Sequence, residues 1–106
     1  MSWEDQHTRT RIVHTVLTRA AADPDRPDLF SDIPELERLF GGADGVLLAL
    51  RYRWNNHFDA KMDQAQQQGQ TAMEAYLELA AEQPVLRAVL DAQYRRRQSQ
   101  SEAMAR

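Results

Sequence analysis

The sequence predicts an all-α fold, a small bundle of four to five helices around one long central helix at about residues 44–68. Apolar residues recur at intervals of three and four through most of the chain, which is the spacing of amphipathic helices. No segment shows the alternating, β-branched pattern of a strand, and there is no internal repeat. The 106 residues fit one domain, which we place at residues 1–97. The polar residues 98–106 should form a disordered tail.

The first helix is expected from Trp3 to about Ala22. Ser2 can act as its N-cap, and no glycine or proline interrupts the segment. A proline-rich and aspartate-rich linker then ends the helix. The apolar positions with helical spacing are Val13, Val16, Leu17 and Ala20, with Ile12 at the edge of the stripe.

A second, short helix is expected after Asp32, its predicted N-cap. Pro34 would lie in the first turn, and Glu35 would complete a capping box. The Gly41-Gly42 pair should end this helix. Because about two turns are not stable alone, its apolar residues must dock on the larger helices. These residues are Leu36, Leu39 and Phe40.

Asp44 is the predicted cap of the long helix, which would be roughly 36 Å long at ~1.5 Å per residue. Its first turns carry apolar residues on several sides, so we expect them to be buried all round. The second half should be buried on one face only. The stripe that defines this face comprises Leu47, Leu50, Trp54, Phe58, Met62 and Ala65.

Two further helices should follow a tight turn at Gly69-Gln70. Thr71 and Glu74 form a capping box, and the short turn requires an antiparallel hairpin with the long helix. Pro84 either kinks the chain or begins a separate helix, and we favour a break near Gln83. The expected apolar positions are Met73, Tyr76, Leu77 and Ala80, then Val85, Leu86, Val89, Leu90 and Tyr94.

The composition excludes several classes of site. A net charge of −3 and a pI of about 5.5 give no general attraction to nucleic acid or to an anionic membrane. The absence of cysteine excludes disulfides, thiolate metal sites and cysteine nucleophiles. No apolar run approaches the ~20 residues of a membrane span, and the N-terminus does not resemble a secretion signal. We therefore expect a cytoplasmic protein without a membrane partner.

Catalytic and metal sites have little support in the residue pattern. His7 and His14 share a helix face but lie two turns apart, roughly 10 Å, too far to ligate one ion. His57 has no ligand at i+4, and Asp59 and Asp63 should lie on a solvated face. The glycine-rich segment before the long helix lacks the strand that precedes a phosphate-binding loop. We expect no enzyme activity, no cofactor and no metal.

Arg51 is the most informative polar residue because it falls within the apolar stripe, about one turn from Trp54. Its guanidinium should stack on an aromatic ring or meet an acidic partner from another helix or chain. The alternative is an arginine whose stem packs while its head reaches water.

Rows of opposite charge lie on the two helices of the predicted hairpin. Helical-wheel angles place the rows on flanks that do not face each other, so we expect no ion pairs between them. They would then face solvent or a second chain. The rows are Arg53, His57 and Lys61 on the long helix, and Glu74, Glu78 and Glu82 on the next.

The segment from Leu39 to Phe58, which reads Leu-Phe-Gly-Gly-Ala-Asp-Gly-Val-Leu-Leu-Ala-Leu-Arg-Tyr-Arg-Trp-Asn-Asn-His-Phe, resembles small all-helical proteins of high-GC bacteria. Those proteins carry no assigned activity. The resemblance implies a helical fold and supplies no catalytic residue.

The leading interpretation is a non-enzymatic protein-interaction module, acting as a homodimer or by docking on another protein. It rests on the long aromatic stripe, which we expect to exceed what the shorter helices can cover. The residues expected to make the contact are Arg51, Trp54, Phe58 and Met62.

Two alternatives remain open. A nucleic-acid-associated protein would use the basic cluster Arg95, Arg96 and Arg97. We prefer the explanation that cations in the last turn of a helix complement the helix dipole. A small-molecule-binding domain would use a pocket among aromatic residues and a histidine. That pocket would comprise Tyr52, Trp54, His57 and Tyr76.

Overall fold

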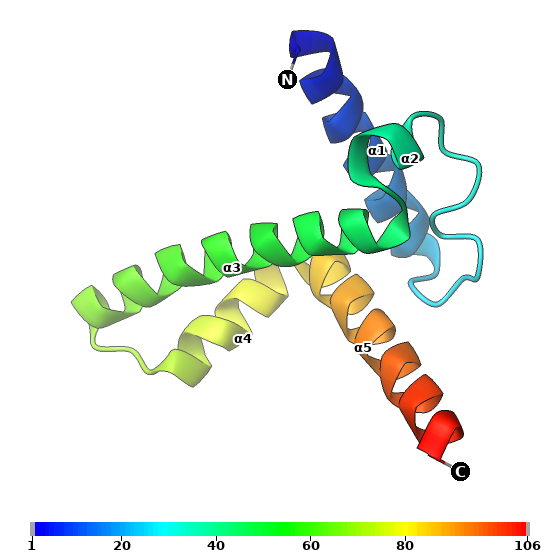
Figure 1. Ribbon diagram of the computed structural model, residues 1–106. Helices are drawn as coiled ribbons and strands as arrows, with labels where there is room; N and C mark the ends of the chain where they lie inside the picture. The colour runs from blue at the N-terminus through cyan, green and yellow to red at the C-terminus, as the bar shows by residue number, and fades with distance from the viewer. Residues whose placement is uncertain (1, 106) are drawn as a thin grey trace.

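The computed structural model describes residues 2–105, which form five helices and no strand (Figure 1). The helices are α1 (Trp3–Ala22), α2 (Leu36–Phe40), α3 (Ala43–Gln68), α4 (Ala72–Glu82) and α5 (Pro84–Ala105). The prediction of an all-α fold around one long central helix is confirmed, with α3 as that helix.

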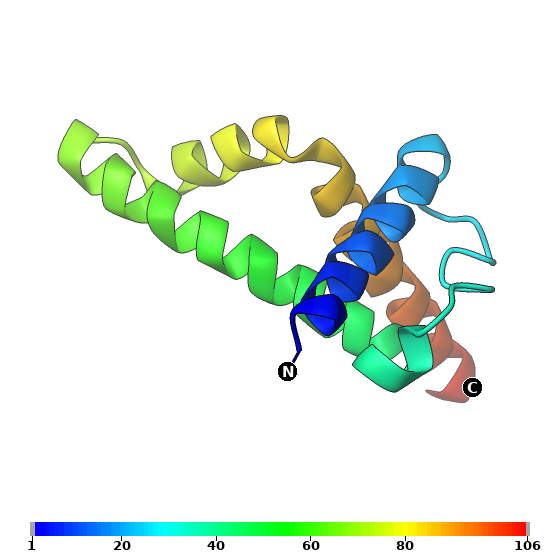
Figure 2. The same cartoon turned by 90° about the horizontal axis from the view of Figure 1, so that it is seen from above.

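The helices form three arms that meet at one hub (Figures 1 and 2). The arms are α1 with α2 against it, the antiparallel α3–α4 hairpin, and α5. The radius of gyration is 15.8 Å, against about 13 Å for a compact chain of this length. The accessible surface is 7231 Å², against about 6,100 Å² for a compact monomer of this mass. The open shape therefore leaves an excess of about 1,100 Å².

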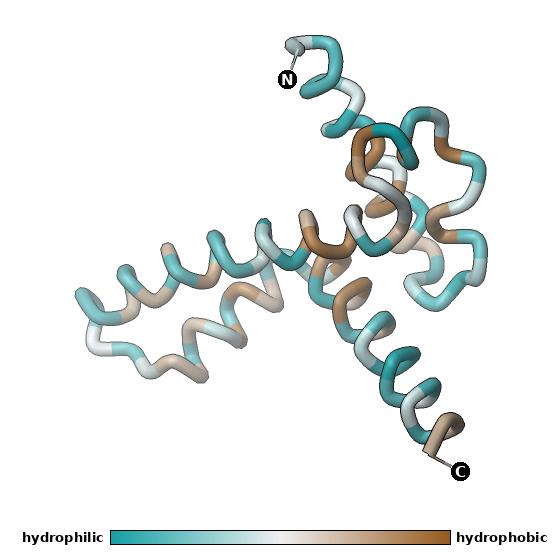
Figure 3. Tube along the Cα trace, in the orientation of Figure 1, coloured by the Kyte–Doolittle hydropathy of each residue, from teal (hydrophilic) through white to brown (hydrophobic). Residues whose placement is uncertain are grey.

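The hydrophobic core lies at the hub, where apolar residues of several helices converge (Figure 3). Val16 of α1, Leu50 of α3 and Val89 of α5 are fully buried there. Leu29, from the loop between α1 and α2, covers the same core and is also fully buried. The predicted burial of the apolar stripe of the long helix is confirmed at the hub, where Leu47 and Leu50 are buried. Val46, on another side of the same turns, is buried as well. Leu48 in the same turns is exposed, so this segment is not buried all round.

Several predicted helix ends are confirmed. The backbone N–H of Asp5 donates to Ser2 Oγ at 3.1 Å, so Ser2 caps α1. Thr71 and Glu74 form both bonds of a capping box at the start of α4. The chain breaks at Gln83, between the end of α4 and the start of α5.

Two predicted caps are wrong. Asp32 and Glu35 adopt left-handed backbone conformations, and α2 begins only at Leu36, without a side-chain cap. Asp44 lies inside the first turn of α3 and does not cap it, because Gly41 and Gly42 both have positive φ and reverse the chain within two residues. Asp44 still places a carboxylate near the positive end of the helix dipole.

The sequence led us to expect a disordered tail at residues 98–106. In the structure α5 continues as a helix to Ala105. Arg106 lies outside the described residues. Residues 98–105 contain no glycine or proline and include several strong helix formers, so the helix has no local reason to end. Their side chains are all exposed.

The predicted apolar face of α4 is partly wrong. Ala75 and Leu79 are buried, whereas Met73 and Leu77 are 65% and 58% exposed. Apolar residues occur on two sides of this helix, and α3 and the hub cover only one of them. Ala75 and the buried Ala65 of α3 are small, which suits the close approach of two antiparallel helices.

Candidate interaction surface

The aromatic stripe of α3 is largely covered within the chain. Trp54 is only 6% exposed, and its ring lies edge-on to Tyr76 of α4, with ring centres 5.8 Å apart. Phe58 also meets Tyr76 at 6.5 Å and is half-buried, as is Met62. The expectation that this stripe exceeds what the other helices cover is therefore wrong for Trp54 and only partly met for Phe58 and Met62.

Arg87 of α5 covers the remaining side of Trp54. Its guanidinium carbon lies 4.6 Å from the centre of a Trp54 ring, within the range of a cation–π contact. Asp91, one turn later, holds the same guanidinium at 2.9 Å. The cation–π contact that the sequence led us to consider for Arg51 is thus made by an arginine of another helix.

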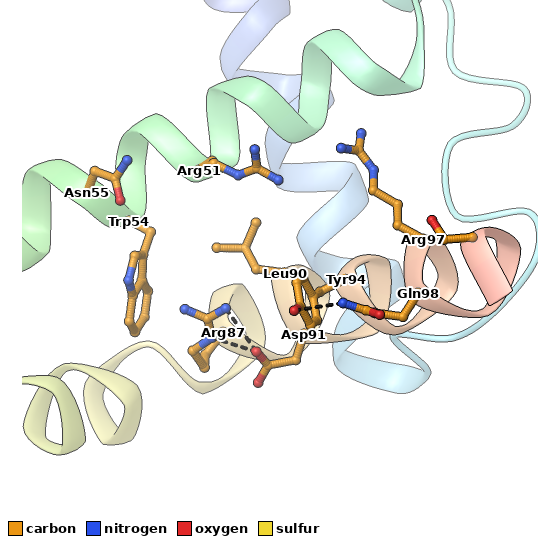
Figure 4. A pocket seen from close by; sticks show the side chains of 10 residues that line it. Arg51, Trp54, Asn55, Arg87, Leu90, Asp91, Tyr94, Arg97 and Gln98 are labelled. Atoms are coloured by element: carbon orange, nitrogen blue, oxygen red, sulfur yellow. Dashed lines mark hydrogen bonds and ion pairs between the residues drawn. The ribbon is translucent and has the colours of Figure 1, made fainter. Parts of the chain in front are cut away.

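Arg51 is exposed and has no ion-pair, hydrogen-bond or cation–π partner among residues 2–105. Its side chain extends along the space between α3 and α5, with its guanidinium toward that of Arg97 (Figure 4). Arg97 is weakly held, because its one ion pair is a 3.5 Å contact to the exposed carboxylate of Asp44. Two guanidinium groups therefore approach the same space from opposite sides.

This space is an open cavity of about 730 Å³, which we call the α3–α5 cleft. Trp54 and Leu90, both almost fully buried, contribute apolar surface, and the exposed Tyr94 adds an aromatic side. Three arginines and one aspartate line it, which gives a formal charge of +2 in a chain whose net charge is −3. The lining residues that matter most are Arg51, Arg87, Arg97, Trp54, Leu90 and Tyr94.

A second hollow of about 510 Å³ adjoins the cleft and shares Arg51 and Asn55 with it. Leu48 and Tyr52 line this hollow and are 66% and 68% exposed. They lie four residues apart and so point to the same side of α3. Arg51 is therefore placed between two hollows.

The basic cluster contacts the chain's own acidic linker. Arg95 lies 3.5 Å from the Asp25 carboxylate, and Arg96 donates a hydrogen bond to the Asp25 carbonyl oxygen. Because α5 continues to Ala105, the cluster is in the middle of the helix. The explanation from the dipole of a last turn is therefore wrong.

The expectation of no ion pairs between the two charged rows is wrong for Lys61. Lys61 of α3 bonds Glu78 at 3.1 Å and also contacts Glu82. Hydrogen bonds from Lys61 to Glu82 and Glu78 raise the pKa of this lysine above its usual value. The flexible lysine stem reaches across the edge of the hairpin, which a comparison of Cα directions does not capture.

The four residues considered for a small-molecule pocket do not line one cavity. Trp54 and Tyr76 contact each other, Tyr52 belongs to the hollow beside Leu48, and His57 is exposed. Sequence reasoning did not assign Arg87 or Leu90 to the candidate site, although Leu90 was expected as an apolar position; both residues bring α5 into the cleft. The i,i+4 pair of Arg87 and Asp91 was the available signal for the first of these.

Within residues 2–105, no three side chains of histidine, aspartate or glutamate gather in a group suited to hold a metal ion. None of the helices in this range combines the length and the apolar character needed to cross a bilayer.

No protein-family model, curated protein or solved structure matches this chain. The geometry of the chain itself therefore carries any functional proposal.

Proposed function

We propose that this chain is a non-enzymatic protein-interaction domain that acts by self-association. The observation that carries the proposal is its open, three-armed shape, which exposes about 1,100 Å² more surface than a compact monomer of the same mass. A standard protein interface covers about 800 Å² on each partner. The excess is thus of the size that one interface would bury.

The character of the exposed surface supports the same proposal. Large apolar side chains are exposed in i,i+4 pairs on two helices, and an aromatic residue is exposed on a third. Grouped exposed apolar residues mark interaction sites, and arginine and tyrosine are frequent in their energetic centres. The exposed residues are Met73 and Leu77 on α4, Tyr94 on α5, and a separate pair, Leu48 and Tyr52, on α3; one interface does not need both pairs.

A catalytic role has less support. Displaced pKa values gather at active sites because catalysis needs them. Here the displaced values belong to members of exposed ion pairs away from the α3–α5 cleft, and their partners explain each shift. These groups are Asp5, Arg26, Asp28, Arg38 and Lys61. The nucleic-acid alternative also has less support, because its three arginines contact acidic residues or the linker backbone of the same chain.

Light scattering coupled to gel filtration tests the proposal. We expect the mass to rise from 12.2 kDa toward twice that value as the concentration increases from micromolar to millimolar. A mass that stays at 12.2 kDa over this whole range would refute self-association.

A further inference from the structure

The α3–α5 cleft is elongated along α5. Arg87, Leu90, Tyr94, Arg97 and Ser101 recur every three or four residues, so they follow one face of the helix. From the first to the last of them α5 rises roughly 21 Å at ~1.5 Å per residue. A long depression with apolar side chains at its base and charged groups beside them is the form that receives an amphipathic helix.

The α4 helix presents a free face of complementary character. Met73, Leu77 and Ala81 are exposed and form an apolar stripe at i,i+4 spacing. At roughly 16 Å, α4 is short enough to fit beside α5. Its 11 residues also include an adjoining row of glutamates, of which Lys61 neutralises one charge. The row is Glu74, Glu78 and Glu82, so its formal charge together with Lys61 is −2.

We infer that in the self-associated protein α4 of one copy occupies the α3–α5 cleft of a second copy. This inference rests on the proposed self-association. The apolar stripe of α4 packs near Leu90 and Tyr94, and its glutamates face Arg51 and Arg97. The formal charges of −2 and +2 offset each other at the contact. Each copy carries one cleft and one α4, so two such contacts related by a two-fold axis close a dimer.

The other exposed apolar pair fits the cleft less well. Leu48 and Tyr52 are flanked in their hollow by Arg9 and Arg51. Docking this face into the cleft would place arginines against arginines, and like charges at a contact cost free energy. The acidic α4 is therefore the occupant that the charge distribution favours.

Paired variants test the contact from both sides. The cleft variant carries Arg51→Glu and Arg97→Glu, and the α4 variant carries Met73→Lys and Leu77→Lys. Each alone should weaken dimerisation at least about tenfold, because it places like charges in the contact. A one-to-one mixture should restore the dimer, since each wild-type α4 finds a wild-type cleft and each lysine-bearing α4 meets a glutamate-bearing cleft.

The matched control is Leu48→Lys with Tyr52→Lys, which adds the same charge to an equally exposed apolar pair. It should dimerise as the wild type does. Apart from Arg97, the substituted residues are Leu48, Arg51, Tyr52, Met73 and Leu77. Within residues 2–105, no side-chain hydrogen bond or ion pair involves them. We therefore expect the variants to fold, and circular dichroism melts check this. If a double variant unfolds, the single variants Arg51→Glu and Leu77→Lys provide the same comparison.

The outcomes separate the two proposals. A wild-type chain that is monomeric throughout refutes both. If the wild type dimerises and the cleft and α4 variants dimerise equally well, the α4-in-cleft contact is refuted and self-association is retained. The same conclusion follows if only the Leu48 and Tyr52 control disrupts the dimer. Failure of the mixture to restore the dimer also refutes this contact.

Discussion

The guanidinium of Arg87 lies 4.6 Å from the centre of a Trp54 ring and joins α5 to α3 directly after the break at Gln83. Asp91 fixes the same group at 2.9 Å from the next turn of α5. Trp54 is therefore enclosed by Tyr76 on one side and by the Arg87 guanidinium on another. This contact lies where the hairpin arm and the α5 arm diverge, so it helps to set the base of the cleft.

Replacing Arg87 by alanine should lower the free energy of unfolding by about 1–2 kcal/mol, because Trp54 loses its cation–π contact and its cover. Urea titration followed by tryptophan fluorescence measures the loss. Asp91→Ala is the control, since it removes an i,i+4 ion pair worth about 0.5 kcal/mol and leaves the stacked guanidinium in place. Equal losses in both variants would show that the ion pair, and not the stacking, is the important contact.

Gly45→Ala should destabilise the fold by about 3 kcal/mol, because overpacking displaces backbone that is already in contact. A Cβ at this position would lie 1.7 Å from the Phe40 carbonyl oxygen, so α2 and the start of α3 would have to separate. Thermal and urea unfolding measure the effect.

Gly41→Ala is the matched control for the Gly45→Ala substitution. The φ of Gly41 is +73° and no atom lies within 4 Å of the added Cβ, so only the left-handed backbone is penalised, by about 1 kcal/mol. Equal stability of the Gly45→Ala and Gly41→Ala variants would contradict the close approach of α2 and α3.

Acid should remove a stabilising contribution of Asp28. A hydrogen bond from Arg26 lowers the pKa of the Asp28 carboxyl to about 2, from 3.8. A lowered pKa in the folded state means that the contribution is complete above the unfolded value and disappears as pH falls through the folded value. The free energy of unfolding of the wild type should therefore exceed that of Asp28→Asn at about pH 5, and the difference should be smaller at about pH 3. The difference should vanish as the pH falls below the folded pKa of about 2. Urea titrations at each pH provide the comparison, and a difference that is independent of pH would contradict it.

Truncation after Gln98 should change the free energy of unfolding by no more than about 0.5 kcal/mol, as expected for exposed positions. The removed side chains are exposed from Ser99 to Ala105. Because an isolated helical end frays, amides of these residues should exchange with solvent fastest within α5. A large loss of stability in the monomer would show that this end of α5 packs on the protein.

The helices and the hub were predictable. Val16, Leu50 and Val89 each lie on the apolar stripe of their own helix, and such a stripe indicates burial whichever element covers it. The buried side of α4 could not be predicted, because the exposed Met73 and Leu77 are as apolar as the buried Ala75 and Leu79. The spacing along α3 also placed Arg51 near Trp54, but only the fold shows that the guanidinium over the Trp54 ring belongs to Arg87 of α5.

The three-armed shape could not be predicted from the sequence either. It depends on the direction that α5 takes after Gln83, whose φ of −125° and ψ of 59° set the turn. Pro84 marks where one helix stops and another starts, but not the angle between them. The α3–α5 cleft arises from that angle, so its residues could not be grouped beforehand.

The hub also bears on how the chain folds as it is synthesised. Its buried residues are spread along the chain from α1 to α5, so the nascent chain carries Val16 and Leu50 well before Val89 leaves the ribosome. Until then the emerging polypeptide has an incomplete core, and its exposed apolar residues are open to chaperones or to aggregation. The final helix therefore completes folding, and a message truncated before α5 should yield a product that proteases remove.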